Sequence, residues 1–530
     1  MSKKIAIFDS TLRDGAQAEG ISYSVEDKWK IIKALDGLGI DYIEAGNPSS
    51  NPKDLEFFSQ IEKNKTKKAK IVAFGSTKRC TLQKEEDVAL QALLKANTRV
   101  VAIFGKSWDF HVERIIKTTL AEYLEIIKET ISFFIEKDKE VIFDAEHFFD
   151  GMKSNPEYAL ETLKAASEAG ANWLVLCDTN GGTLPPEVNE MTKKVVKKFS
   201  LPIGIHCHND SGLAVANSMT AVEAGATQVQ GTLIGFGERC GNANLSSVIP
   251  NLQLKKGYMC LPKNKMKRLT PTARYVAEIS NIRLNNNLPY VGKSSFAHKG
   301  GMHIDAMLKD TRSFEHIQPE EVGNERRFLM SEVSGRSTVL NKIQKISPEL
   351  QKSSKETQRI IELLKELEYE GYQFEAAESS FELRVRKYLG KYKPLFHLES
   401  FTIIDGQPIQ NSSISSSAII KVKVDGQEEI TASEGNGPVN ALDQALRKAL
   451  EVFYPELKEM RLTDYKVRVL NPGKATAAKV RVLIESTDGQ ENWTTVGVST
   501  DIIEASCLAL LDSIEYKLIK DIEKKFKVFV

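Results

Sequence analysis

Two histidines stand two residues apart in the segment His206-Cys207-His208-Asn209-Asp210. The short apolar run before it, residues 201–205, is typical of a β-strand, in which alternate side chains point to the same face. His206 and His208 are therefore expected to point the same way and Cys207 the opposite way. Two imidazoles side by side at a strand end are half of a divalent-metal site, although such a pair also occurs as two ordinary hydrogen-bonded histidines.

An arginine and an aspartate, Arg13 and Asp14, follow the first apolar run of the chain. Elsewhere such neighbours form a surface ion pair. If this strand end lies on the same face as the two histidines, Asp14 becomes a third metal ligand and Arg13 a donor that stabilises an anion or an enolate. Two imidazoles and one carboxylate leave open coordination positions for substrate and water.

A glycine-rich loop and a single glutamate are further candidates. Residues 235–242 contain three glycines, which allow the backbone to approach a ligand closely, and they deliver the amide oxygen of Asn242 to the same face. Glu146 stands at the end of another apolar run. Its carboxylate either faces solvent or orders water and substrate at that face.

Two histidines in the middle of the chain, His298 and His303, flank a Gly-Gly pair. The surrounding residues 294–305 are polar, and we interpret them as a loop. Such a loop suits a mobile element that carries an acid or a base.

The elements that must position these residues are eight short, β-rich apolar runs, each followed by a helical pattern. Helix starts are marked by Ser24 with Asp27, which resembles a capping box, and by Asn155 before Pro156. Eight such units indicate a parallel TIM barrel, with a doubly wound open sheet as the alternative. The barrel is favoured because the polar clusters all follow strands, and strand ends converge on one face of a barrel. The runs are residues 5–11, 42–45, 70–74, 99–104, 140–146, 173–177, 202–206 and 228–234.

The chain is long enough for several domains. We expect a barrel over residues 1–262, helical linker subdomains that complete the active site over 263–395, and an α+β regulatory and dimerisation domain over 396–530. The last segment contains a weak repeat, in which Gly-Gln-Glu, a strand and a helix recur about 63 residues apart. The predicted helices of the repeat are residues 439–453 and 502–514.

Composition excludes several classes of protein. The 72 basic and 71 acidic residues are balanced, which gives no footprint for nucleic acid, and no apolar run is long enough to span a membrane. The six cysteines form no C-x-x-C pair, as expected for reduced thiols in a cytoplasmic protein.

Four of these motifs together resemble the α-isopropylmalate, homocitrate and citramalate synthase family. Other segments resemble its bacterial citramalate synthase branch more than the isopropylmalate enzymes. The resemblance implies condensation of acetyl-CoA with pyruvate and water to (R)-citramalate and CoA, which would feed isoleucine synthesis through 2-oxobutyrate. The alternative within the family is 2-isopropylmalate synthesis from 2-oxoisovalerate. The family motifs are residues 9–17, 206–210, 235–242 and 296–305, and the branch segments are 144–151, 177–183 and 323–327.

The resemblance also implies roles for residues at matching positions. Thr179 would hold the substrate carboxylate, Arg13 would polarise the ketone and stabilise the alkoxide, and Glu146 would position groups for these steps. His303 would be the base, which in such enzymes reaches in from the partner subunit of a homodimer. The implied metal is Mn²⁺ or Mg²⁺, with Zn²⁺ or Co²⁺ as alternatives, and its ligands would be Asp14, His206, His208 and Asn242.

One departure concerns the base. Family members often have tyrosine where this chain has Phe314. If that hydroxyl assists the base, this protein does without it or uses another group such as Tyr290.

The predictions of substrate size and of regulation rest on fewer residues. Four bulky rings near the third to fifth strand ends either narrow the pocket for pyruvate or pack in the core; they are Phe74, Phe104, Phe143 and Phe148. The C-terminal domain is expected to bind an amino-acid effector, with isoleucine as the candidate. The loops at 435–437 and 471–473 are either effector contacts or ordinary turns.

Two rival functions use the same features differently. A lyase on the same barrel would cleave rather than condense, but it would have no need of the C-terminal repeat. An amino-acid sensor without activity would not need Arg13, Asp14, the two histidines and Asn242 together.

Overall fold

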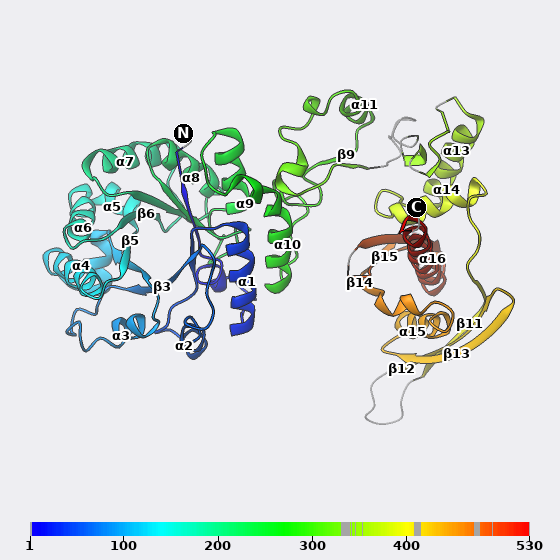
Figure 1. Ribbon diagram of the computed structural model, residues 1–530, viewed down its shortest axis with the longest axis horizontal. Coiled ribbons are helices and arrows are strands. Elements are labelled where there is room, and N and C mark those ends of the chain that lie inside the picture. Colours follow the sequence, from blue (N-terminus) through cyan, green and yellow to red (C-terminus); the bar gives the residue numbers. More distant parts are fainter. Residues whose placement is uncertain are drawn as a thin grey trace. The chain divides into compact units, whose positions relative to one another are not determined.

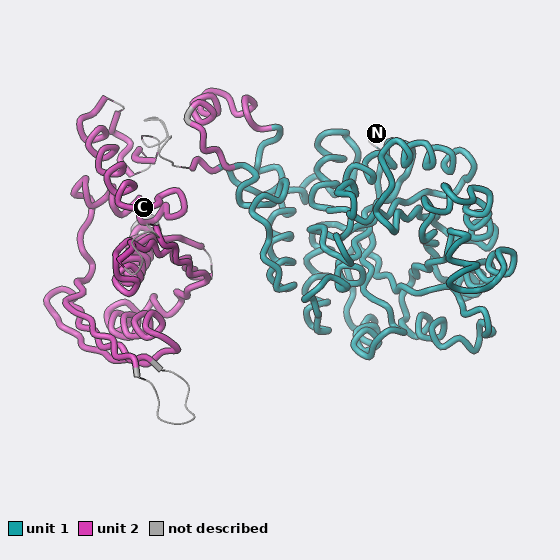
Figure 2. Tube along the Cα trace, turned by 180° about the vertical axis from the view of Figure 1, so that it is seen from behind, with its two compact units in different colours: residues 1–296, 316–326 teal, residues 297–315, 327–530 magenta. Residues whose placement is uncertain are grey.

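The structure is a computed structural model that describes residues 3–329, 340, 342–344, 346–351, 353–406, 415–470, 477–489 and 491–528. The chain divides into two compact units (Figure 1 and Figure 2). Unit 1 consists of residues 1–296 and 316–326, and unit 2 of residues 297–315 and 327–530. No helix among the described residues is both long and apolar enough to cross a membrane.

Unit 1 contains a closed barrel of eight parallel strands, as the sequence predicts. The barrel closes where β1 pairs with β8, from Ala6 opposite Gln228 to Asp9 opposite Gly231. This closure rules out the open doubly wound sheet. The strands are β1 (Ala6–Asp9), β2 (Tyr42–Glu44), β3 (Lys70–Ser76), β4 (Val100–Lys106), β5 (Glu140–Glu146), β6 (Trp173–Asp178), β7 (Ile203–Cys207) and β8 (Gln228–Gly231).

Helices surround the barrel in Figure 1. The predicted starts are confirmed, because Ser24 and Asp27 form a reciprocal capping box and Asn155 accepts a hydrogen bond from the backbone of Tyr158, with proline at the next position. The helices between the strands are α1 (Val25–Leu38), α2 (Pro52–Ser59), α3 (Val88–Lys95), α4 (Leu120–Ile135), α5 (Phe148–Ser154), α6 (Pro156–Glu168), α7 (Pro185–Lys198) and α8 (Ala214–Glu223).

Side chains of the barrel strands alternate between the interior and the helical layer. Phe8, Val72, Ala102 and Ile142 pack together in the interior and are fully buried. Since alternate residues share a face, the residues two and four positions after Ile142 on β5 also point inward. This parity decides which residues at the strand ends reach the mouth of the barrel.

The rest of unit 1 follows the barrel. It contains α9 (Leu245–Pro250), α10 (Leu269–Ile279) and the return segment 316–326. Two hydrogen bonds fasten this segment: Thr270 donates to the carbonyl of Val322 (2.7 Å), and the Asn324 amide donates to the carbonyl of Tyr290 (2.8 Å).

The first part of unit 2 corrects one prediction. The stretch 294–305 is not simply a loop, because the strand β9 (Ala297–His298) pairs with β10 (Arg327–Phe328) and the helix α11 (Gly301–Lys309) begins at the second glycine. Ile304 and Met307, three residues apart, are buried and give that helix its apolar face. Two further helices are α13 (Lys355–Glu370) and α14 (Glu378–Tyr388).

The C-terminal repeat is confirmed as two copies of three antiparallel strands followed by a helix. The second helix runs 14 residues beyond its predicted end at 514. The expected effector loop at 471–473 lies outside the described residues. The first copy is β11 (His397–Gly406), β12 (Ser415–Val424), β13 (Gln427–Gly435) and α15 (Pro438–Leu450), and the second is β14 (Arg461–Val469), β15 (Val480–Thr487), β16 (Asn492–Ser499) and α16 (Ile502–Val528).

Candidate active site and metal centre

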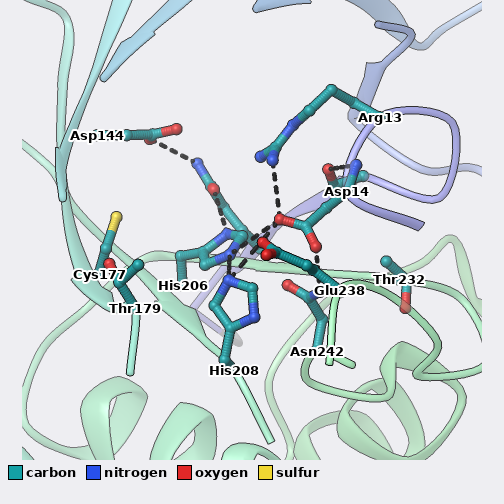
Figure 3. A network of polar contacts seen from close by, with 12 residues as sticks. Arg13, Asp14, Asp144, Cys177, Thr179, His206, His208, Thr232, Glu238 and Asn242 are labelled. Atoms are coloured by element: carbon teal, nitrogen blue, oxygen red, sulfur yellow. Dashed lines mark hydrogen bonds and ion pairs between the residues drawn. The ribbon is translucent and has the colours of Figure 1, made fainter. Parts of the chain in front are cut away.

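Asp14, His206 and His208 meet at the carboxyl end of the barrel (Figure 3). One ligand atom from each lies within 4.8 Å of the other two. The Nε2 atoms of both histidines are 3.8 Å from the same Asp14 oxygen, and they are 3.4 Å from each other. The three side chains converge although they come from the ends of β1 and β7, as their predicted common face requires.

The charges at this cluster suit a divalent cation. Burial would raise the pKa of Asp14, but the neighbouring guanidinium of Arg13, with smaller effects from the two histidines, outweighs it and holds this pKa well below its usual range. Burial, with the neighbouring His206, lowers the pKa of His208 to about 3. Burial also lowers the pKa of His206. At neutral pH the cluster therefore offers one carboxylate and two neutral imidazoles, the protonation states that bind a metal.

Asn242 completes the cluster from the loop after β8. It forms an isolated bridge with His208, and its amide nitrogen donates to Asp14 (2.7 Å). Its Oδ1 and the Nδ1 of His208 are buried and have no hydrogen-bond partner among the residues that the structure describes. An unpartnered buried oxygen beside a carboxylate and two imidazoles fits an ion with oxygen and nitrogen ligands.

Arg13 is held on several sides next to this cluster. Its Nε donates to Glu44 (2.6 Å) and its Nη1 to Asp14 (2.8 Å). Its guanidinium carbon lies 3.9 Å from the centre of the Phe74 ring. Glu44, fully buried at the end of β2, belongs to a polar cluster that the sequence marks, but sequence reasoning gave it no role.

The aromatic rings near the strand ends separate into two groups. Phe74 and Phe104 stack on each other with ring centres 5.2 Å apart. Phe143 and Phe148 are instead fully buried in the core that includes the helical layer. These two rings are core packing, because Phe143 alternates with the inward residues of β5. Only Phe74 and Phe104 remain candidates for the pocket wall.

Glu146 forms an ion pair with Lys106, its register neighbour at the end of β4. The ammonium nitrogen of Lys106 lies 5.3 Å from the centre of the Phe104 ring. Sequence reasoning missed Lys106. The signal that could have found it is parity, since Lys106 follows Phe104 by two residues and points to the same face.

Thr179 follows β6 on the same face of the barrel and is drawn with the cluster in Figure 3. Its hydroxyl oxygen accepts a hydrogen bond from the backbone N–H of His147 (2.9 Å). The hydroxyl hydrogen of Thr179 is therefore available to donate to another group.

The sequence analysis did not predict the two buried polar residues that support His206, Gln230 and Asp144. The Nδ1 of His206 lies 2.9 Å from the amide oxygen of Gln230, and the amide nitrogen of Gln230 donates to Asp144 (3.1 Å). Burial and the nearby charge of Glu44 raise the pKa of Asp144 to about 8. The inward parity of β5 and β8 is the signal that places these two residues in the barrel.

His303 lies in unit 2, on α11, where its ring stacks on Phe314 with centres 4.0 Å apart. Tyr290, the alternative source of a hydroxyl, lies in unit 1 and donates to Asn251 (2.7 Å). The structure brings Arg13, Asp14, His206, His208 and Asn242 together, whereas Glu146 pairs with Lys106 and His303 lies in the other unit. The roles of all these residues stay predictions.

A cavity of about 270 Å³ adjoins Arg13 at the mouth of the barrel. It is lined by Phe74, by Gln17 and by residues of the loop after β2, among them Gly46 and Asn47.

Three family profiles match consecutive parts of the chain. The HMGL-like profile matches residues 4–276, the homocitrate synthase post-HMGL domain-like profile residues 290–371, and the LeuA allosteric (dimerisation) domain profile residues 375–518. The order of the three profiles follows the barrel, the middle region and the repeat.

Curated relatives match nearly the whole chain. The (R)-citramalate synthase of Aquifex aeolicus is 54% identical over 525 residues, which cover 99% of both chains. The (R)-citramalate synthase of Geobacter sulfurreducens is 51% identical and covers 98% of both. The 2-isopropylmalate synthase of Pyrococcus furiosus is 32% identical over 97% of this chain and 99% of that protein. The chain belongs to the α-isopropylmalate, homocitrate and citramalate synthase family, within its (R)-citramalate synthase branch.

Proposed function

We propose that this protein condenses acetyl-CoA with pyruvate and water to give (R)-citramalate and CoA, a step toward 2-oxobutyrate and isoleucine. The observation that carries the proposal is the difference in identity between full-length relatives: 54% and 51% to (R)-citramalate synthases against 32% to a 2-isopropylmalate synthase. The cluster of Asp14, His206 and His208 supports a metal-dependent reaction.

The 2-oxo acid binds at the mouth of the barrel. Asp14, His206, His208 and Asn242 would hold a divalent ion, which when bound supplies a Lewis acid for the ketone of the substrate. Arg13 donates to the ketone oxygen, and its ion pairs to Glu44 and Asp14 fix its direction before substrate arrives. Thr179 donates its hydroxyl hydrogen to the substrate carboxylate, since its oxygen already accepts from His147.

Carbon–carbon bond formation requires a base. His303 is the proposed base that removes a proton from the methyl group of acetyl-CoA. The resulting carbanion attacks C2 of pyruvate, the ketone π electrons move to oxygen, and the alkoxide is stabilised by Arg13 and then protonated. Water hydrolyses the thioester and releases CoA, which makes the condensation irreversible. Glu146, held by Lys106, orients groups for these steps.

The pocket walls favour a small 2-oxo acid. Phe74 and Phe104 stack beside Arg13 and leave less room for the isopropyl group of 2-oxoisovalerate than for the methyl group of pyruvate. The acetyl thioester enters from the cavity of about 270 Å³ that adjoins Arg13.

Four further parts of the proposal concern the whole protein. The metal is Mn²⁺ or Mg²⁺, because carboxylate and amide oxygens are half of the ligand set, with Zn²⁺ or Co²⁺ as alternatives. The protein is a homodimer, supported by the match of residues 375–518 to a dimerisation domain.

The same segment binds isoleucine as an effector. The protein works in the cytoplasm, supported by six free cysteines.

We also propose a functional division of the chain. Residues 1–262 carry the metal and the 2-oxo acid, residues 263–395 carry the base, and residues 396–530 regulate. The structural units and the family profiles place their boundaries at somewhat different residues.

A CoA-release assay with full-length protein tests the proposal. Acetyl-CoA and Mn²⁺ are supplied with either pyruvate or 2-oxoisovalerate, and the thiol is measured. We expect turnover with pyruvate, loss of turnover in His206→Ala, and retention in His397→Ala, an exposed histidine of the C-terminal domain that serves as the control. Preference for 2-oxoisovalerate would move the protein to the isopropylmalate reaction and leave the metal site in place.

A further inference from the structure

The amide group of Gln230 lies between a metal-site histidine and a buried carboxyl group. Gln230 is on β8 and fully buried. Its oxygen is 2.9 Å from Nδ1 of His206, and its nitrogen is 3.1 Å from Asp144 and 3.3 Å from the amide oxygen of Gln228. Asp144 and His206, the two residues at the ends of this chain of contacts, are labelled in Figure 3.

The surroundings determine which end of the Gln230 amide faces His206. Two oxygens, from Asp144 and Gln228, stand at one end, so the NH₂ group belongs there. The Asp144 carboxyl group offers this NH₂ group an acceptor oxygen in its ionised form and, through its carbonyl oxygen, in its neutral form. The carbonyl oxygen of Gln230 therefore faces His206.

The orientation of Gln230 fixes the tautomer of His206. A carbonyl oxygen can only accept, so Nδ1 of His206 must carry the hydrogen. A neutral imidazole has one N–H, and Nε2 of His206 then keeps its lone pair. Nε2 is the nitrogen that lies 3.8 Å from Asp14 and 3.4 Å from Nε2 of His208.

We propose that Gln230 is a positioning residue of the metal site, which holds His206 in the Nδ1–H tautomer so that Nε2 presents its lone pair to the ion. The inference rests on the proposed metal site and adds the group that sets its ligand state. His208 has no equivalent support, since its Nδ1 has no partner among the described residues.

Mn²⁺ binding to the metal-stripped full-length protein tests this proposal, with free Mn²⁺ read from its electron paramagnetic resonance signal. Gln230→Met removes the acceptor at similar volume, and we expect affinity to fall by about 10- to 100-fold. Gln230→Glu keeps an acceptor oxygen toward Nδ1, and we expect it to retain affinity near the wild-type value. Gln228→Met is the comparison variant. It removes one of the two oxygens that hold the Gln230 NH₂ group but leaves Asp144 and the Gln230 oxygen in place, so we expect a clearly smaller loss than in Gln230→Met.

Three outcomes would overturn the proposal: wild-type affinity in Gln230→Met, an equal loss in Gln228→Met, or no retention in Gln230→Glu. An equal loss in both methionine variants would assign the effect to packing. Thermal unfolding of each stripped variant shows whether the barrel is intact. A wild-type protein that binds Mn²⁺ but does not turn over pyruvate would contradict the proposed function and leave this inference standing.

Discussion

The guanidinium group of Arg13 lies over the ring of Phe74, with its central carbon 3.9 Å from the ring centre. Phe74 in turn stacks on Phe104, and the ammonium group of Lys106 lies over the ring of Phe104. Each of the two cations is also paired with a carboxylate, Glu44 for Arg13 and Glu146 for Lys106. The stack therefore fixes two positive charges on either side of the wall that we assign to the substrate methyl group.

Replacement of Arg13 by lysine keeps the positive charge but removes the planar guanidinium group with its several N–H donors. A lysine cannot contact Glu44 and Asp14 together while it lies on Phe74, so its donor is no longer aimed at the ketone. We predict that Arg13→Lys lowers kcat/KM for pyruvate by about 10²- to 10³-fold, the range found when one preorganised donor is removed. Steady-state kinetics check this, and an unchanged kcat/KM would remove Arg13 from the reaction.

Phe104 should limit the size of the 2-oxo acid. Phe104→Ala opens the wall beside Arg13, and we predict that the ratio of kcat/KM for 2-oxoisovalerate to that for pyruvate rises by about 10- to 200-fold. Phe143→Leu is the control, since Phe143 is core packing on the neighbouring strand. That variant should lower the melting temperature and leave the ratio unchanged. A similar change of ratio in both variants would argue against a wall at Phe104.

The ion pair of Lys106 and Glu146 has a counterpart at the other end of the barrel, where Lys70 pairs with Glu140. Because the active site of a TIM barrel sits at its carboxyl end, Lys106→Met should lower kcat by about 10²-fold, the cost of a misplaced catalytic group. Lys70→Met removes a similar pair from the amino end and should leave kcat near the wild-type value. Equal kcat in the two variants would show that Lys106 does not position Glu146.

The base and the metal site can be separated by one variant. His303→Ala should lower kcat by about 10²- to 10⁴-fold, the usual contribution of a general base. Mn²⁺ affinity should stay at the wild-type value, because the ligand set lies in the barrel. Loss of metal binding together with activity would place His303 in the metal site instead.

The raised pKa of Asp144 predicts a pH dependence of stability. Burial holds the carboxyl group in its neutral form up to about pH 8, whereas in the unfolded chain it ionises near 3.8. Between these values the folded protein binds a proton that the unfolded chain has released, so this contribution to stability is full at low pH and is lost as pH rises toward 8. Asp144→Asn lacks this contribution, and its amide oxygen can still accept from Gln230.

The melting temperature of wild type minus that of Asp144→Asn should therefore fall steadily from pH 5 to pH 8. Tryptophan fluorescence mainly follows the barrel, because three of the four tryptophans (Trp29, Trp108 and Trp173) lie in unit 1 and one (Trp493) lies in unit 2. Asp305→Asn, an exposed position on α11, serves as the control and should show no such trend. A difference that stays constant with pH would mean that Asp144 is ionised in the folded protein.

The sequence predicts the barrel well because its signals are local. Apolar runs, capping residues such as Ser24 and Asn155, and the spacing of His206 and His208 are all readable within a few residues. The placement of Asp14 beside the histidines also follows, since strand ends of a barrel meet on one face.

What escaped prediction depends on contacts between distant strands. Gln230 gains its role from His206 and Asp144, which lie 24 and 86 residues away in the chain. From the sequence, Phe143 could line the pocket or pack in the core, and its place on β5 decides for the core. The helix at Gly301–Lys309 was not predicted, because its start contains two glycines, which are poor helix formers. It forms because Ile304 and Met307 are buried.

Product identification is the most direct measurement of the central claim. Full-length protein is incubated with Mn²⁺, acetyl-CoA labelled with ¹³C in the acetyl group, and an equimolar mixture of pyruvate and 2-oxoisovalerate, and the products are separated by chiral chromatography with mass detection. We predict labelled (R)-citramalate as the main product in wild type and none in His206→Ala. Labelled 2-isopropylmalate as the main product, or released CoA without a new carbon–carbon bond, would contradict the proposed reaction.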